Sequence, residues 1–170
     1  VEALQCLSSP DGVDHEDVRM TKRGEGNLSD TRLIDGMVLE AGLTLDRLPR
    51  RLDSGTVLAL TCPLEQEEAS RETEIEIEGT DQWMAFIEAK EAILKKKTDA
   101  VLATGANVVL SAEGIEPSIF HALTDAGCFV LGGIERSGIE DLAKASGATM
   151  CDHLDDADAS VLGSFSSLEI

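Results

Sequence analysis

The glycine pair at Gly132 and Gly133 is the pattern in this sequence that comes closest to a ligand-binding motif. It follows the apolar run at residues 128–131 and precedes a helical pattern that starts near Ser137. Backbone N–H groups at such a strand-to-helix turn favour anions, so the turn could hold a phosphate group. The turn has neither a G-x-G-x-x-G pattern nor a Walker A pattern, and it contains no lysine. A tight connection between a strand and a helix explains the same glycines.

Two groups of acidic side chains offer possible cation ligands. Residues 151–156 contain Cys151, Asp152, His153 and two further aspartates, and four glutamates alternate along residues 72–78 on one face of a predicted strand. The first spacing matches no zinc pattern, and a divalent site on the second would need ligands that converge in three dimensions. A polar loop and a solvated strand face explain both groups. We therefore predict no metal site, and the residue spacing assigns no catalytic residue.

The elements that would position these residues alternate between strand and helix in the second half of the chain. Continuous apolar runs at residues 56–61 and 107–111 are typical of strands buried on both faces. Strands and helices that alternate at this spacing imply a parallel sheet with crossover helices, so the predicted fold class is α/β. The other predicted strands are residues 17–23, 33–39, 128–131 and 148–151. The predicted shorter helices are residues 117–126 and 137–146. The second of these helices begins with a capping box at Ser137 and ends at Gly147.

The longest helical pattern covers residues 82–103, with Asp81 as the predicted N-cap and Gly105 after its end. At about 100° per residue, one apolar stripe runs along this helix. Lys90 and Lys97 lie close to that stripe, and a helix buried along its whole length would not tolerate two ammonium groups there. We therefore predict that part of the helix projects from the domain. The residues of the stripe are Trp83, Ile87, Leu94 and Val101, flanked by Met84 and Phe86 near the N-terminal end.

The composition is strongly acidic and poor in aromatic residues. Of 170 residues, 33 are Asp or Glu and 14 are Lys or Arg, which gives a formal net charge of −19, and there is no tyrosine. Such a surface would repel a phosphate backbone, so nucleic acid is not an expected partner. Repulsion among carboxylates that are spread along the whole chain is largely screened only in strong brine. We therefore expect a halophilic, archaeal source.

The chain also lacks the signals of a membrane protein or of a disulfide framework. No apolar run approaches the roughly 18 residues of a membrane-spanning helix, so we expect no membrane partner. The four cysteines, Cys6, Cys62, Cys128 and Cys151, have no C-x-x-C spacing. We interpret them as reduced core thiols of a cytoplasmic protein, with a disulfide pair as the alternative. Because the chain opens with Val1 and not with Met, we expect it to be a piece of a longer protein.

Four segments carry a likeness to a known family. They are DTRLIDGMVL at residues 30–39, ALTCPLE at residues 59–65, ATGANVV at residues 103–109 and DLAKASGA at residues 141–148. In this order and spacing they resemble the apical domain of group II chaperonins, the thermosome and CCT branch of the Hsp60-like proteins. The resemblance implies an α/β domain of swivelling β/α/β layers with a helical protrusion at about residues 64–103. It covers residues 30–163, so residues 1–29 would be a lead-in segment derived from the intermediate domain and residues 164–170 an exit segment.

In that family the apical domain binds non-native polypeptides, and its protrusion forms the built-in lid of an ATP-driven folding chamber. The resemblance therefore implies a chaperone whose partners are non-native polypeptides and the neighbouring subunits of a double ring. It implies no catalytic residue and no cofactor in this fragment, because the family binds ATP and Mg in its equatorial domain. Polypeptide contacts are implied at the protrusion tip, on the helix next to the cavity and in the loop after Pro63-Leu64-Glu65. These residues are Trp83, Met84, Phe86 and Ile87; Glu116, Ile119, Phe120 and Leu123; and Glu65 and Glu67.

The alternative is a small α/β ligand-binding domain or enzyme that holds a phosphate at the Gly132-Gly133 turn. The position of the long helix distinguishes the two hypotheses. A chaperonin domain needs the helix at residues 82–103 to stand off the body, and a helix covered along its length by its own sheet would exclude that function.

Overall fold

The computed structural model describes Val18 and residues 20–22, 27–34, 36–39, 51–65 and 80–169. The chain divides into two units, residues 1–39 and 40–170. In the first unit a 3₁₀ turn, η2 (Leu28–Asp30), is closed by the Asn27 N–H, which donates to Asp30 Oδ2 at 2.7 Å. The described residues within 17–23 and 33–39 form no strand, so these two predictions are wrong there. A strand needs a partner for its N–H and C=O groups, and alternation alone does not supply one.

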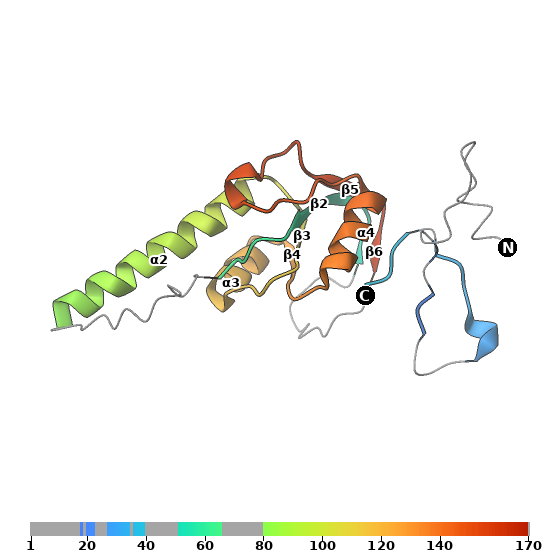
Figure 1. Ribbon diagram of the computed structural model, residues 1–170, viewed down its shortest axis with the longest axis horizontal. Helices are drawn as coiled ribbons and strands as arrows, with labels where there is room; N and C mark the ends of the chain where they lie inside the picture. Colours follow the sequence, from blue (N-terminus) through green and yellow to red (C-terminus); the bar gives the residue numbers. More distant parts are fainter. Residues whose placement is uncertain are drawn as a thin grey trace. The chain divides into compact units, whose positions relative to one another are not determined.

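The body of the second unit is a four-stranded sheet with the strand order β4-β3-β2-β5 (Figure 1). β2 (Gly55–Leu60) runs parallel to β3 (Val108–Ser111), and β3 runs parallel to β4 (Phe129–Leu131). β5 (Gly163–Phe165) is antiparallel to β2, while β1 (Arg51–Leu52) and β6 (Leu168–Glu169) form a separate antiparallel pair. The α/β class and three of the predicted strands are therefore confirmed.

The predicted strand at residues 148–151 is wrong except at Cys151. This residue forms an isolated parallel bridge with Leu60. Its N–H donates to Ala59 O at 3.0 Å, and its carbonyl accepts from Thr61 N at 3.0 Å. The first half of the same β2 edge is occupied by β5, which the sequence pattern did not reveal. The edge of β2 is thus shared by one short strand and a single bridging residue.

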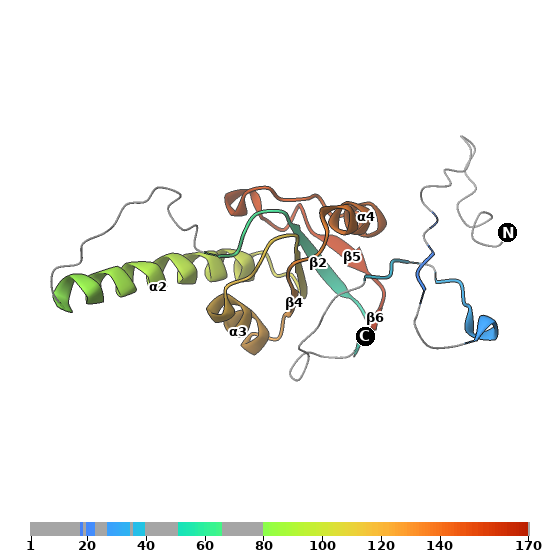
Figure 2. The same ribbon diagram turned by 60° about the horizontal axis from the view of Figure 1, so that its bottom comes forward.

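Helices cover both faces of the sheet, as Figure 2 shows. The inward side chains of alternate strand positions, including Leu58 and Val109, belong to one core cluster with Ile119 of α3 (Pro117–Asp125). Ile139 of α4 (Arg136–Ser146) is fully buried but lies outside that cluster. The period-two alternation of buried strands therefore directs one set of side chains towards α3 and the other towards α4.

The helix ends follow the predictions in part. Gly147, in the left-handed conformation at φ 73°, ends α4 as expected. The capping box predicted at Ser137 is wrong, because α4 begins at Arg136 with Glu135 as its N-cap and Ser137 lies inside the first turn. Asp81 is likewise not an N-cap, since α2 (Thr80–Ala103) starts one residue before it. Its carboxylate still lies in the first turn, where negative charge favours the helix dipole.

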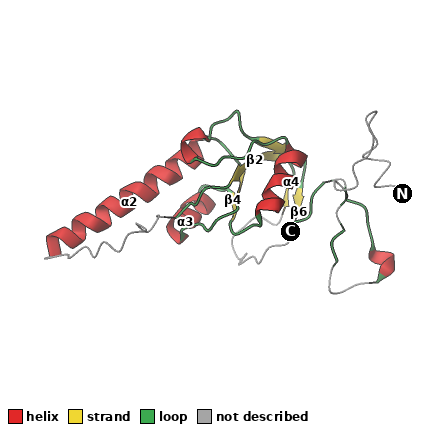
Figure 3. Ribbon diagram, viewed as in Figure 1, coloured by secondary structure: helices red, strands yellow, loops and turns green. Residues whose placement is uncertain are grey.

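The helix α2 has 24 residues and is about 36 Å long. Its C-terminal half packs on the body through Leu94, Thr98 and Val101, which are all buried. Its N-terminal half extends past the sheet and past α3, as one continuous helix in Figures 1 and 3. The predicted projection of part of this helix is therefore confirmed. The predicted protrusion also includes residues 66–79, which lie outside the described residues, as does the predicted strand at residues 72–78.

Candidate functional site

The projecting half of α2 carries four large apolar side chains that remain exposed. Trp83 and Met84 are 51% and 55% exposed, and Phe86 and Ile87 are 39% and 38% exposed. We call these four residues the tip face. The rings of Trp83 and Phe86 lie against each other, with centroids 6.2 Å apart and planes inclined by 30°. Large apolar side chains that gather on a surface mark sites where another molecule binds.

The tip face continues an apolar stripe that the body covers further along the helix. Ile87, Leu94 and Val101 are spaced by seven residues and therefore lie on nearly the same side of α2. Val101 is 1% exposed and Leu94 is 7% exposed, whereas Ile87 is 38% exposed. Exposure thus rises along one row of chemically similar side chains, because the body ends before the helix does.

The structure divides the predicted contacts on α3 into two groups. Ile119 and Leu123 are fully buried in the core cluster, where they hold α3 against the sheet. They are therefore not available as surface contacts, and the expectation that they meet a polypeptide is corrected. Phe120 is half-buried at the edge of the core and lies edge-on to His121, with ring centroids 5.9 Å apart. Ile119, Phe120 and Leu123 are spaced by one and three residues and so lie on one side of α3, which is the side that packs on the core.

Glu116 connects α3 to the projecting helix. Its backbone N–H donates to Leu64 O at 3.1 Å, and its carboxylate Oε1 lies 3.9 Å from Lys90 Nζ of α2. Both charged side chains of this pair are partly exposed, so the ion pair contributes little to stability, about 0–1 kcal/mol. Lys90 lies one turn beyond Ile87, so the pair joins the inner edge of the tip face to the start of α3.

Glu65 lies at the end of the Pro63-Leu64-Glu65 motif and is exposed. Leu64 forms a parallel bridge with Ile115, which places Glu65 beside the turn before α3. The Glu65 carboxylate lies against Gly114, where a Cβ atom would require the carboxylate to move. The structure therefore brings Glu65 and Glu116 to the same region, apart from the tip face, while Glu67 lies outside the described residues.

Two backbone N–H groups at the Gly132-Gly133 turn are hydrogen-bonded within the fold. Gly133 N donates to Glu113 O at 3.1 Å, and Ile134 N donates to Ser111 O at 3.2 Å. A Cβ on Gly132 would lie 2.8 Å from Ile115 Cγ1, and Gly133 has a φ of 72°. These contacts account for both glycines as a tight connection between β4 and α4. The Gly133 and Ile134 N–H groups are therefore not available to hold a phosphate.

The polar residues after Cys151 are held by hydrogen bonds and an ion pair. The Thr61 hydroxyl donates to the Asp152 carboxylate, and Arg136 Nη2 lies 3.9 Å from the same carboxylate. Within the described residues, no three His, Cys, Asp or Glu side chains are arranged to hold a metal ion. The four glutamates at residues 72–78 lie outside them.

The three cysteines in the described part of the chain, Cys62, Cys128 and Cys151, are free thiols. Burial raises the pKa of each of them. In Cys62 the nearby Lys97 ammonium and a backbone hydrogen bond oppose this rise of the pKa. A raised pKa keeps these thiols protonated and weakly nucleophilic, which fits packing residues and not catalytic ones.

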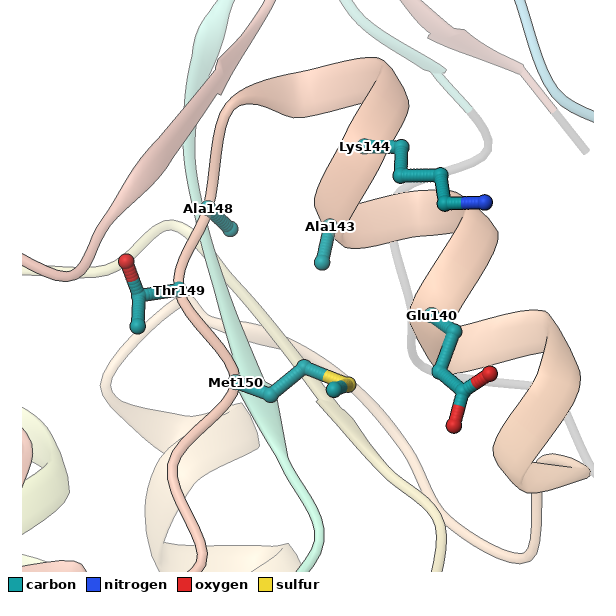
Figure 4. A pocket seen from close by; sticks show the side chains of 6 residues that line it. All are labelled: Glu140, Ala143, Lys144, Ala148, Thr149 and Met150. Atoms are coloured by element: carbon teal, nitrogen blue, oxygen red, sulfur yellow. The ribbon is translucent and has the colours of Figure 1, made fainter.

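Sequence patterns did not point to a hollow of about 500 Å³ between α4 and the segment that follows it (Figure 4). Ala143 and Ala148 face each other across it, and the Met150 side chain extends towards the helix, while Thr149 points away. Its other lining residues are Glu140 and Lys144. One acid and one base at the rim of an aliphatic wall form no converging polar set, so this hollow does not resemble a catalytic site.

No helix in the described ranges is both long and apolar enough to cross a membrane. The feature that distinguishes this domain is the projecting helix α2, which carries the exposed tip face and extends from an α/β body. The chain belongs to the TCP-1/cpn60 chaperonin family, whose family model matches residues 1–170.

Relatives and solved structures agree with this assignment. The chain is 33% identical to a thermosome subunit of Methanopyrus kandleri and 34% identical to the thermosome subunit beta of Aeropyrum pernix. These matches cover 94% and 96% of the chain but only 30% of each relative, so the chain spans about a third of their length or less. The open-state monomer of a group II chaperonin from Methanococcoides burtonii is similar in fold, with a TM-score of 0.77 at 24% identity over 99% of this chain and 37% of that one. The predicted family and fold are confirmed, while the halophilic source stays a prediction.

Proposed function

We propose that this chain is the apical domain of a group II chaperonin and that the tip face binds non-native polypeptides. The observation that carries the proposal is the exposure of Trp83, Met84, Phe86 and Ile87 on a helix that stands off the body. In the complete subunit, this helix would also form part of the built-in lid of the folding chamber. The similarity to thermosome subunits supports both roles.

The side chains of the tip face suit a changing set of unfolded partners. Non-native chains expose apolar side chains that are buried after folding, and burial of apolar surface favours binding at about 25 cal/mol per Å². Aromatic rings offer large contact areas, and the flexible Met84 adapts to irregular shapes. Because each of these side chains is already half covered, one contact contributes on the order of 1 kcal/mol. Binding at a single domain would therefore be weak, and several domains acting together would hold a chain reversibly.

The residues near the start of α3 would add polar contacts. We propose that Glu65, Glu116 and the exposed edge of Phe120 meet the same polypeptide closer to the body. The two carboxylates favour basic segments over acidic ones, since complementary charge decides which partners approach. Glu67 stays a predicted contact. The buried Ile119 and Leu123 would act only by holding α3 in place.

The chemistry of the complete machine would lie elsewhere in the subunit. In line with the chaperonin family to which the chain belongs, we assign the binding and hydrolysis of ATP with Mg to the equatorial domain of the complete subunit, and the double ring to contacts between such subunits. Free, protonated cysteines are compatible with a reducing cytoplasm.

The proposal is tested by the suppression of aggregation of a chemically unfolded model protein. Light scattering is followed for the wild type and for a variant in which Trp83, Phe86 and Ile87 are all replaced by Ser. We expect the variant to lose most of its protection against aggregation. The matched control replaces Ile93 and Leu102, which are exposed further along α2 and outside the tip face, by Ser. Equal protection by all three proteins, with thermal unfolding unchanged, would contradict a role for the tip face.

A further inference from the structure

The short segment Pro63–Glu65 offers hydrogen-bonding groups in two opposite directions. On one side Leu64 forms a parallel bridge with Ile115, and Leu64 O accepts from Glu116 N at 3.1 Å. In extended backbone, successive carbonyls point to opposite sides. The carbonyls of Pro63 and Glu65 therefore point away from Ile115, along an edge that a further strand would normally pair with.

The described residues show that edge capped by a side chain of α2. Lys97 Nζ donates to Glu65 O at 2.6 Å and to Pro63 O at 3.2 Å. An ammonium group has three donors on a flexible stem, so it can serve two carbonyls at once. Hydrogen bonds from a charged donor are shorter and stronger than those between neutral groups. The lysine thus supplies the hydrogen-bond donors that a pairing strand would otherwise supply.

We propose that Lys97 is a positioning residue that locks the Pro63–Glu65 segment to α2 and, through it, fixes the start of α3 relative to the projecting helix. Three elements meet at this point: α2 through Lys97, the segment itself, and the Ile115–Glu116 turn into α3. The Lys90–Glu116 ion pair, at 3.9 Å, adds a looser second link between α2 and α3. This arrangement explains why a charged residue lies close to the buried stripe of α2, between Leu94 and Val101.

The consequence for binding rests on the proposed function. If a polypeptide touches both the tip face and the region of Glu65 and Glu116, the spacing of these two surfaces depends on the Lys97 hydrogen bonds. Lys97 holds the Pro63 and Glu65 carbonyls, so it acts through the backbone of this segment. Its role can therefore be measured without any polypeptide present.

The test is hydrogen exchange at the Glu116 amide, whose acceptor is Leu64 O. In Lys97→Met, which removes the donors but keeps an unbranched apolar stem, we expect this amide to exchange about tenfold faster or more, because a charged hydrogen bond is lost from the element that protects it. Amides of β3, which lie in the centre of the sheet, are the internal reference and should be unchanged. Lys97→Arg keeps the charge and several donors, so it should restore exchange to within about threefold of the wild type.

Two controls make the result specific. Lys96→Met removes the same charge from the preceding, exposed position of α2 and should leave the exchange rate of the Glu116 amide unchanged. If Lys97→Met fails to fold, as judged by circular dichroism, Lys97→Gln is used, and its single amide donor should give an intermediate rate. Wild-type exchange at Glu116 in a folded Lys97→Met or Lys97→Gln variant would overturn the proposal. Loss of polypeptide binding in the tip-face variant bears only on the proposed function, so the two ideas fail separately.

Discussion

The rings of Trp83 and Phe86 lie against each other with centroids 6.2 Å apart, and both remain exposed at the outer end of α2. The two residues are three positions apart on a helix, which places them on neighbouring parts of one face. A ring pair of this kind contributes about 0.5–1.5 kcal/mol. Such a pair is too weak to hold the fold together, but it forms a broad, rigid apolar surface.

We therefore expect the double replacement Trp83→Ala and Phe86→Ala to lower the free energy of unfolding by no more than about 1.5 kcal/mol. Chemical denaturation followed by circular dichroism measures this quantity. A loss of more than about 3 kcal/mol would be typical of aromatic residues removed from a core. That result would mean that the pair is covered in the folded protein and that the tip face is not a free surface.

Neighbouring residues on α2 provide a second test of where the body ends. Leu94 is 7% exposed and belongs to the core cluster, whereas Ile93 is 47% exposed. We expect Leu94→Ala to reduce the free energy of unfolding by about 2–5 kcal/mol, since it leaves a cavity between α2 and the body. Ile93→Ala should change it by about 0.5 kcal/mol or less. Equal effects at the two positions would contradict the one-sided packing of this part of the helix.

The buried thiols predict a dependence of stability on alkaline pH. Burial raises the pKa of Cys128, so the folded protein holds this proton at a pH where the unfolded chain has released it. The stabilisation is fully present below the thiol pKa of the unfolded chain, about 8.5, and is lost as the pH rises through the higher pKa of the folded state. Denaturant titrations at steps of about half a pH unit between about pH 7.5 and 10 measure this change in the free energy of unfolding.

Cys128→Ala is the matched variant for this prediction. Because it removes one thiol whose pKa is raised, its unfolding free energy should fall less steeply with pH than that of the wild type. Cys62 and Cys151, which also have raised pKa values, would account for the remaining slope. Identical slopes in the wild type and the variant would show that Cys128 ionises equally well in both states.

The net charge of −19 predicts that salt stabilises the protein. Near 1 M salt the Debye length is about 3 Å, compared with about 10 Å at 0.1 M, so repulsion between surface carboxylates is strongly reduced. We expect the melting temperature to rise as KCl is increased from low to multimolar concentration. A nonionic solute at the same osmolality separates this effect from general exclusion of solute. A melting temperature that stays flat or falls with KCl would contradict the expected halophilic origin.

The sequence predicted the parts of the fold that depend on local pattern. The apolar runs that become β2 and β3, and Gly147 at the end of α4, are recognisable because burial and left-handed backbone restrict the residue type. Part of α2 leaves the body as predicted, but Lys97, on which that prediction partly rested, lies in the packed half of the helix and donates to Pro63 O and Glu65 O. The sequence did not reveal β5, because Gly163–Phe165 has no apolar alternation and its pairing with β2 is decided by distant residues.

The candidate site could be predicted to the level of the helices that carry it but not of each side chain. The helix that contains Glu116 and Phe120 was found, yet the buried Ile119 and Leu123 were placed on its outer surface, since the family resemblance identifies a helix without giving its rotation. The Lys97 hydrogen bonds could not be foreseen. They join residues more than thirty positions apart, and one acceptor belongs to a residue that has no side-chain signal for such a role.

The unbroken row from Val101 through Leu94 and Ile87 to Trp83 has a last implication for how a guest chain would be held. Along its inner half, the row is sealed by the domain's own helix α3 and core. A guest lying along the outer half would meet the same kind of surface in the same orientation. The bound chain would extend the apolar contact that α3 and the core make with the inner half of the row. Its release would require only that the apolar surface of the outer half become exposed to water again.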